Sequence, residues 1–265
     1  MLARVRVSYL GSVYPLFGSH PRPLALARRN RLTQTTVSRC PRQRPTDSRS
    51  LRRTQTRETD LTAACGGRTV FFDLGGVTCR FSSARRLDAL AQASGLSADE
   101  VYGRLFASGF DQDCDRGRYQ LDEVCAQIDA RLGVTLERTR LARLWAQGFE
   151  PDPDVLALID RVRHAAPTVM LSNNGPLVHA MVVELLPDVA ARFDQLCFSY
   201  QVGALKPDPQ AYVRTLERLG VKPAQSVFVD DVQENVEGAR AAGMDAVRFV
   251  SAEALAEQLQ ERGLI

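Results

Sequence analysis

The stretch Thr69–Cys79, TVFFDLGGVTC, is the segment on which the fold prediction depends. Four residues suited to a buried strand run directly into an acid, Asp73, and then into the flexible pair Gly75 and Gly76. A carboxylate at the carboxyl end of a parallel strand lies where α/β proteins bind their ligands. The segment therefore predicts a buried first strand whose end takes part in chemistry.

Strand-like and helix-like segments alternate after this point. Further strands are expected at Thr168–Ser172, Gln195–Ser199, Ser226–Asp230 and Ala246–Val250, with amphipathic helices near 153–165, 176–186, 208–219, 233–242 and 252–262. Such alternation is typical of a parallel sheet covered by helices. The sequence thus predicts an α/β protein with a Rossmann-like core at 66–80 and 151–265.

The long gap after the first strand has a different pattern. Ser97 and Glu100 form a capping box. Apolar residues from Leu121 to Leu132 repeat with helical spacing and end at Gly133. These features predict a small helical cap at 81–150, with Trp145 in its core.

Charge is distributed unevenly along the 265 residues, whose net charge is +3. Residues 1–65 contain thirteen arginines against Asp47, Glu58 and Asp60, a balance of +10, so the rest of the chain carries −7. The basic segment fits a transit peptide, a tail that holds an anionic surface, or a start site assigned too early. We interpret it as a disordered extension or such a start-site artefact, and nucleic acid is not an expected partner.

Cysteine usage and hydropathy bear on location. The six cysteines contain no CxxC pair, which favours reduced thiols in a cytoplasmic protein. No apolar run reaches the length of a membrane span. The expected state is a monomer or a homodimer.

Polar residues follow several of the expected strands. They are Asp73, Ser172 with Asn173, Lys206 in GALKPDP, and the pair Asp230 and Asp231. The carboxyl ends of parallel strands lie along one edge of a sheet, so these side chains are expected to meet. Their types suit phosphoryl transfer, in which catalysis is largely positioning and charge neutralisation.

Each residue type has a physical reason to be there. An acidic nucleophile is repelled by a phosphate dianion, so it needs positive charge nearby. Asp73 and Asp230 suit Mg²⁺, which prefers oxygen ligands, and the backbone carbonyl at Gly75 can complete the set. Lys206 supplies a point charge, and Ser172 with the backbone N–H groups that follow suits phosphate oxygens.

Four motifs in order resemble the haloacid dehalogenase (HAD) superfamily: FFDLGGV, VMLSNNG, GALKPDP and VFVDDVQENVEGA. The likeness is greatest to glucose-1-phosphatase-like enzymes and the N-terminal phosphatase half of soluble epoxide hydrolases. It implies that Asp73 is a nucleophile that forms an aspartyl-phosphate, and that the cap closes over the substrate. The implied roles are catalysis by Asp73, Ser172, Lys206 and Asp231, substrate binding by Ser172, Asn173 and Lys206, and metal binding by Asp73, Gly75 and Asp230.

Gly75 departs from the superfamily pattern, because most of its phosphatases carry a second Asp at this position. General acid–base catalysis contributes about 10²–10⁴-fold, and its loss is felt least by sugar 1-phosphates and acyl phosphates. The expected function is a Mg²⁺-dependent phosphatase for a small phosphate ester such as a sugar phosphate. The alternatives are a metal-free dehalogenase and a catalytically silent binding protein.

The segment Asp111–Asp122, DQDCDRGRYQLD, resembles a calcium-binding loop. Its Gly117 falls one position too late for such a loop. We therefore expect a solvated turn before the helix at Leu121, from which Arg116 can reach the substrate.

Overall fold

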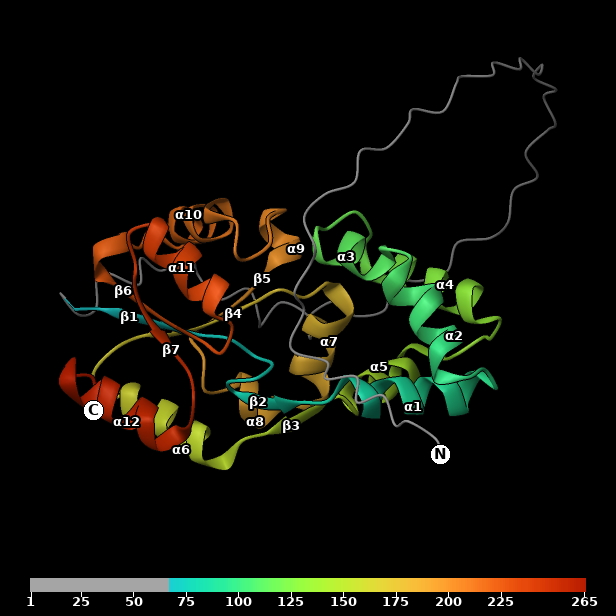
Figure 1. Cartoon of the computed structure of the whole chain (residues 1–265), viewed down its shortest axis with the longest axis horizontal. Helices are drawn as coiled ribbons and strands as arrows, with labels where there is room; N and C mark the ends of the chain where they lie inside the picture. The colour runs from blue at the N-terminus through green and yellow to red at the C-terminus, as the bar shows by residue number, and fades with distance from the viewer. Residues whose placement is uncertain (1–66) are drawn as a thin grey trace, which may run out of the picture. The chain divides into compact units, whose positions relative to one another are not determined.

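The computed structural model describes residues 67–265, and the expectations for residues 1–65 lie outside the described residues. A five-stranded parallel sheet has the strand order β5–β4–β1–β6–β7 (Figure 1). The strands are β1 (Thr69–Phe72), β4 (Thr168–Ser172), β5 (Gln195–Phe198), β6 (Ser226–Asp230) and β7 (Asp245–Arg248). The predicted α/β fold is confirmed, and β1 lies at its centre.

Side chains of β1 alternate between two apolar cores, as the pleat of a strand requires. Val70 and Phe72 pack with one cluster, and Phe71 packs with the other. Both sides of this strand are therefore buried, which explains its continuous apolar run. The first face is covered by α6 (Pro153–Val162), α7 (Pro176–Leu185) and α12 (Ala252–Glu261), and the second by α10 (Pro209–Leu219) and α11 (Gln233–Ala241) (Figure 1).

The segment between β1 and β4 forms the helical cap, which we define as residues 83–146. Its elements are α1 (Ser83–Ser94), α2 (Ala98–Tyr102), the π-helix η1 (Gly103–Ala107), α3 (Phe110–Asp115), α4 (Leu121–Leu132) and α5 (Arg138–Ala146). The capping box of Ser97 and Glu100 is present, and Gly133 ends α4 with φ 72°. Trp145 is buried among cap residues, as predicted. Helices α4 and α5 contact α7 of the core.

A short antiparallel ribbon joins core and cap. It consists of β2 (Cys79–Phe81) and β3 (Phe149–Pro151), with Cys79 opposite Pro151. Two ion pairs flank it, Arg80–Asp152 at 2.9 Å and the exposed pair Arg85–Glu150 at 2.6 Å. Sequence reasoning missed this ribbon, because three residues are too few to show an alternating pattern. Three short helices complete the core: α8 (Pro187–Ala190), α9 (Ser199–Val202) and η2 (Pro223–Gln225).

The expectation of a solvated turn at Asp111–Asp122 is wrong for its first half. Helix α3 includes Asp111–Asp115, and Asp115 is only 5% exposed. Phe110 and Cys114, four residues apart, are buried and hold this helix on the cap core. The turn is confined to the residues around Gly117, whose φ is +76° and where a Cβ would collide with the carbonyl oxygen of Tyr200. A helix cannot wrap a calcium ion as a loop does.

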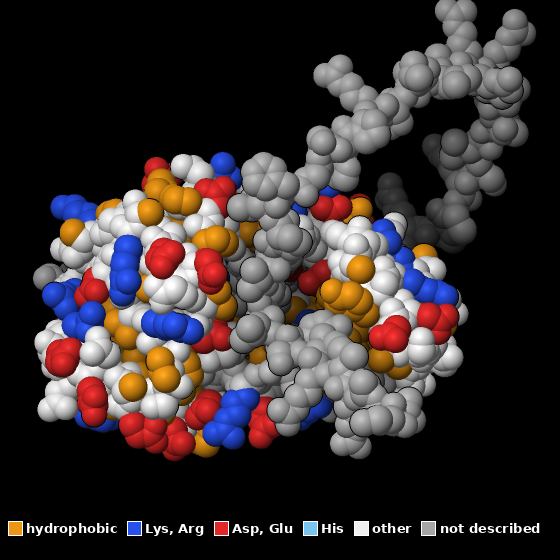
Figure 2. Space-filling view, viewed as in Figure 1, with side chains coloured by type: hydrophobic (Ala, Val, Ile, Leu, Met, Phe, Trp, Pro, Cys, Tyr) orange, Lys and Arg blue, Asp and Glu red, His pale blue; other side chains and the backbone are white. Residues whose placement is uncertain are grey.

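Charged side chains of both signs are intermixed on the face of the described residues seen in Figure 2. This distribution agrees with the expectation that basic charge is not spread over the folded part of the chain. Within residues 67–265, no helix combines the length and the apolar character needed to cross a bilayer.

Candidate active site

The predicted polar residues meet at the carboxyl edge of the sheet. Asp73 follows β1, Ser172 ends the neighbouring β4, and Asp230 ends β6 on the other side. The Lys206 side chain, 1% exposed, lies between two of them. Its Nζ is 3.0 Å from Oδ1 of Asp73 and 2.6 Å from Oδ2 of Asp230. One lysine thus bridges two buried carboxylates.

The position of Lys206 is fixed from several directions. Its Nζ donates to the carbonyl oxygen of Leu171 at 3.0 Å. The Asn173 side chain holds the Lys206 backbone, with Nδ2 donating to its carbonyl at 2.7 Å and Oδ1 accepting from its N–H at 2.8 Å. The Asn173 amide, predicted to bind substrate, is therefore engaged in positioning Lys206.

Ser172 lies at the start of a segment that leads into α7. Its Oγ accepts a hydrogen bond from Nδ2 of Asn174 at 2.9 Å. Since a hydroxyl that accepts still carries its own proton, Ser172 retains one donor for a ligand. The N-terminus of α7 begins just beyond Gly175, and the N–H groups of a helix N-terminus favour an anion.

Three carboxylates form a compact group. Asp73, Asp230 and Asp231 each offer an oxygen within 4.8 Å of the others. Oδ1 of Asp231 is buried and accepts no hydrogen bond within the described residues, and the buried Oδ1 of Asp73 faces the Lys206 ammonium group at 3.0 Å. One lysine cannot neutralise three acids at this separation. The donor set therefore fits a hard divalent cation such as Mg²⁺.

The same crowding shifts acid–base equilibria. Burial raises the pKa of Asp73 to about 6, an effect that Lys206 opposes and Asp230 reinforces. Burial, and then Asp230, also raise the pKa of Asp231. For Lys206, burial acts to lower the pKa, but Asp230 and Asp73 outweigh it and hold the pKa above its usual value. The ammonium group is therefore charged, and its one positive charge faces two carboxylates in direct contact and a third nearby.

Comparison with known proteins identifies the family. Residues 68–243 match the model of the haloacid dehalogenase-like hydrolases. The chain belongs to this family. It is a hydrolase, as the four motifs predicted.

Named relatives and a solved structure agree with this assignment. The chain is 32% identical to Phosphatase MT3486 of Mycobacterium tuberculosis over 67% of this chain and 84% of that protein. It is 27% identical to D-ribitol-5-phosphate phosphatase of Bacteroides thetaiotaomicron over 64% of this chain and 85% of that protein. A HAD-family enzyme of Bacteroides thetaiotaomicron, solved in complex with magnesium and inorganic phosphate, shares the fold with a TM-score of 0.59. The two sequences are 19% identical, and the match covers 69% of this chain and 94% of that chain.

Supporting residues that the sequence reasoning did not single out surround the HAD carboxylates. Nδ2 of Asn235 donates to Oδ1 and Oδ2 of Asp230 at 3.0 and 3.1 Å. The hydroxyl of Thr78 donates to the carbonyl oxygen of Asp73 at 2.6 Å. Asn235 lies in the quoted motif VFVDDVQENVEGA, five residues after Asp230, which places it in the first turn of α11. This spacing from Asp230 was the sequence signal that could have identified Asn235 as a supporting residue.

The two glycines that follow Asp73 and Leu74 differ in their steric roles. At Gly75 an added Cβ would meet Phe149 and Phe81 at ordinary contact distances of 3.5 and 3.6 Å. At Gly76 the φ is +91°, and a Cβ would collide with the Asp231 carboxylate. The contact with Asp231 therefore requires a glycine at position 76, whereas position 75 has room for a Cβ.

Gly76→Ala is expected to raise the Mg²⁺ concentration needed for half-maximal hydrolysis by about 10- to 100-fold, the range seen when groups that orient a metal site are displaced. The added methyl group must push Asp231 out of the carboxylate group. The matched control is Gly75→Ala, which adds the same atom one residue earlier without a collision. Metal titrations of activity for both variants decide the matter, and equal curves for the two would contradict the steric role of Gly76.

Proposed function

We propose that this chain is a Mg²⁺-dependent phosphatase that hydrolyses a small phosphate ester through an aspartyl-phosphate on Asp73. The observation that carries the proposal is a group of three close carboxylates, of which Asp73 and Asp230 share the ammonium group of Lys206. Two HAD relatives named as phosphatases and a related enzyme solved with magnesium and phosphate support it. Asp73, Asp230 and the carbonyl of Gly75 would hold the metal, with Asp231 beside them.

Bound Mg²⁺ supplies positive charge that lowers the repulsion between the phosphate and the nucleophile. The chain's own groups perform the other steps. Lys206 and the Ser172 hydroxyl hold phosphate oxygens, together with the N–H groups that lead into α7. A carboxylate oxygen of Asp73 attacks phosphorus, and the bond from phosphorus to the leaving oxygen breaks. Water then hydrolyses the acyl phosphate, which releases inorganic phosphate and restores Asp73.

Gly75 narrows the range of substrates. No carboxyl group is available there to protonate the leaving oxygen, and the neighbouring groups are the rings of Phe81 and Phe149. The leaving group must then depart with little help. Sugar 1-phosphates and acyl phosphates meet that condition better than simple alkyl phosphates.

Metal dependence tests the proposal. In a panel of phosphate esters, the purified full chain is expected to release phosphate with Mg²⁺, to lose this activity in excess chelator, and to regain it when Mg²⁺ is restored. Phosphate and halide release are measured in parallel. Halide release that survives the chelator would indicate a dehalogenase instead, and no turnover of any compound would indicate a binding protein.

A further inference from the structure

Tyr212 carries a hydroxyl group into an apolar part of the core. The residue lies on α10, its side chain is fully buried, and its ring packs in the apolar cluster on the second face of the sheet. A phenylalanine would fill nearly the same space. Because a buried hydroxyl is costly unless it forms a hydrogen bond, the role of this residue depends on the partner of its oxygen.

The hydroxyl of Tyr212 holds the first turn of α11. It donates to the carbonyl oxygen of Asn235 at 2.6 Å, 23 residues away along the chain. The two helices also approach closely within the next turn. A Cβ added at Gly238 would collide with the carbonyl oxygen of Pro207 and lie 3.1 Å from the Tyr212 ring. The position of α11 is therefore fixed against α10 and against the segment that follows Lys206.

Asn235 transmits this restraint to a carboxylate of the site. Its backbone is held by Tyr212, and its side-chain Nδ2 donates to both oxygens of Asp230, at 3.0 and 3.1 Å. Asp230 also accepts from the Val232 N–H at 2.9 Å and from Lys206 at 2.6 Å. Among these donors, Asn235 is the one that contacts both oxygens, so a shift of its amide moves the carboxylate as a whole.

The ring of Tyr212 makes a second connection. It packs edge-on against Phe228, with the ring centroids 5.4 Å apart. The Lys206 ammonium group lies over the Phe228 ring, with Nζ 5.1 Å from its centroid. Tyr212 thus contacts the support of Asp230 through its hydroxyl and the support of Lys206 through its ring. Replacement of Tyr212 by phenylalanine removes the first contact and retains the second.

We propose that Tyr212 is a positioning residue for the metal site and acts through Asn235 to orient Asp230 toward a divalent cation. This inference rests on the Mg²⁺-dependent function proposed above and adds a residue that lies outside the group of carboxylates. Groups that hold the ligands of a metal site tune its affinity by orienting those ligands. The Tyr212 hydroxyl is one hydrogen bond more remote than the Asn235 amide, so its effect on affinity is the smaller of the two.

The test measures metal affinity without turnover. Mn²⁺ suits the same oxygen ligands as Mg²⁺, and its binding to the substrate-free full chain is followed by EPR. Tyr212→Phe is expected to raise the dissociation constant of Mn²⁺ by about 3- to 10-fold, the effect of one lost hydrogen bond. Asn235→Ala keeps the backbone carbonyl and removes the amide, and it is expected to raise the constant by about 10- to 100-fold.

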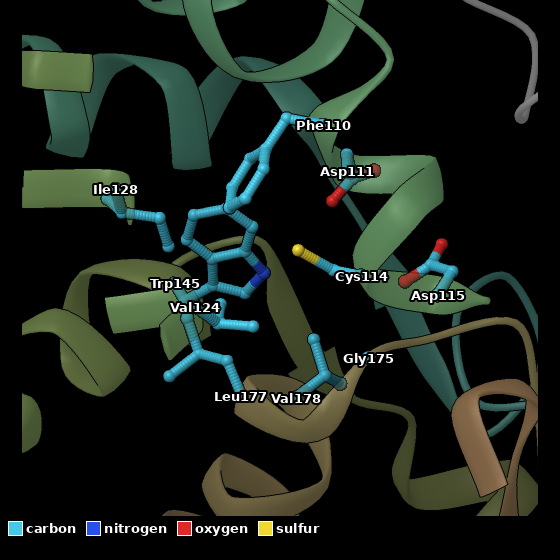
Figure 3. A pocket seen from close by; sticks show the side chains of 10 residues that line it. All are labelled: Phe110, Asp111, Cys114, Asp115, Val124, Ile128, Trp145, Gly175, Leu177 and Val178. Carbon is cyan, nitrogen blue, oxygen red and sulfur yellow. The ribbon is translucent and has the colours of Figure 1, made fainter. Parts of the chain in front are cut away.

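Two controls separate positioning from stability. Thr215→Val removes another buried hydroxyl from α10, one that donates to the Ala211 carbonyl of the same helix at 2.7 Å. Ile128→Val removes a methyl group from the cap core, where Ile128 lies beside Trp145 (Figure 3), and destabilises the chain through lost packing. Both are expected to bind Mn²⁺ as the wild type does. A loss of affinity in Thr215→Val equal to that in Tyr212→Phe would indicate a general loosening of α10 and overturn the inference.

A double variant decides whether Tyr212 acts through Asn235. Once Asn235→Ala has removed the amide, Tyr212→Phe is expected to cause no further loss of affinity, so the two effects are not additive. Additive effects, or a wild-type affinity in Tyr212→Phe, overturn the inference and leave the metal site intact. A wild-type chain that binds no Mn²⁺ overturns the metal site and the inference together. A chain that binds Mn²⁺ but hydrolyses no phosphate ester overturns the proposed function, and the affinities still decide the role of Tyr212.

Discussion

Asp73→Asn is expected to lower kcat for phosphate esters by at least about 10⁴-fold, the scale of loss when a covalent nucleophile is removed. An amide oxygen is neutral and does not displace an ester oxygen from phosphorus. The substitution changes little else, because Lys206 keeps its 2.6 Å contact with Asp230. Steady-state phosphate release with saturating Mg²⁺ measures the loss, and turnover within about tenfold of wild type would rule out an aspartyl-phosphate on this residue.

Stability provides the control for this variant. The pKa of Asp73 is raised to about 6, so the folded chain binds its proton more tightly than the unfolded chain does. The free energy of unfolding therefore falls as the pH rises from about 4 to about 6, by roughly 3 kcal/mol for a shift of this size. In chelator at pH 7, Asp73→Asn is expected to melt above the wild type, and the difference is expected to vanish near pH 4. A variant that melts well below the wild type would show that the lost activity reflects misfolding.

Lys206→Met is expected to cost about 3–5 kcal/mol of stability in the metal-free chain, because it leaves two buried carboxylates without their counter-charge. For a folded part of this size that corresponds to a melting temperature lower by roughly 10 °C. Millimolar Mg²⁺ is expected to restore part of the loss, since a divalent cation between the same carboxylates replaces the missing positive charge. Thermal unfolding with Mg²⁺ and with chelator measures both effects.

Lys222→Met is the matched control, because Lys222 is the other lysine of the chain and its side chain is exposed. It should melt within about 1 °C of wild type, as surface substitutions usually do. Mg²⁺ should shift its melting temperature no more than it shifts that of the wild type. If Mg²⁺ raises the melting temperature of Lys206→Met by no more than it raises that of the wild type, the ion does not replace the positive charge of Lys206 beside the carboxylates.

The sheet was predictable because its strands are short apolar runs that end in polar residues. Asp73, Ser172 and Asp230 mark the ends of neighbouring strands, and the switch-point rule brings such ends together without knowledge of any contact. Lys206 was more difficult to place from spacing alone, because it lies on a loop. Its backbone is held by two hydrogen bonds with the Asn173 side chain, which no spacing in the sequence predicts. The residue types therefore predicted the members of the site, whereas their hydrogen bonds required coordinates.

The cap was predicted in outline and less well in detail. The periodicity of α4 is visible in the sequence, but α3 is only six residues long and most of them are polar or acidic. Arg86 shows why the rest was hidden. Its three aromatic contacts come from residues 81, 145 and 149, so no local pattern reveals that this arginine is buried. Contacts between segments distant in sequence decide the environment of such a side chain.

The ribbon of β2 and β3 brings the two ends of the helical cap together. Cys79 lies opposite Pro151 and Phe81 opposite Phe149, so the two ends of the intervening segment lie side by side. A segment with adjacent ends can be exchanged for another with little disturbance of the scaffold that carries it. An insertion or replacement between these two strands can therefore be accommodated without moving Asp73, Ser172 or Asp230, which lie at the edge of the sheet outside the exchanged segment.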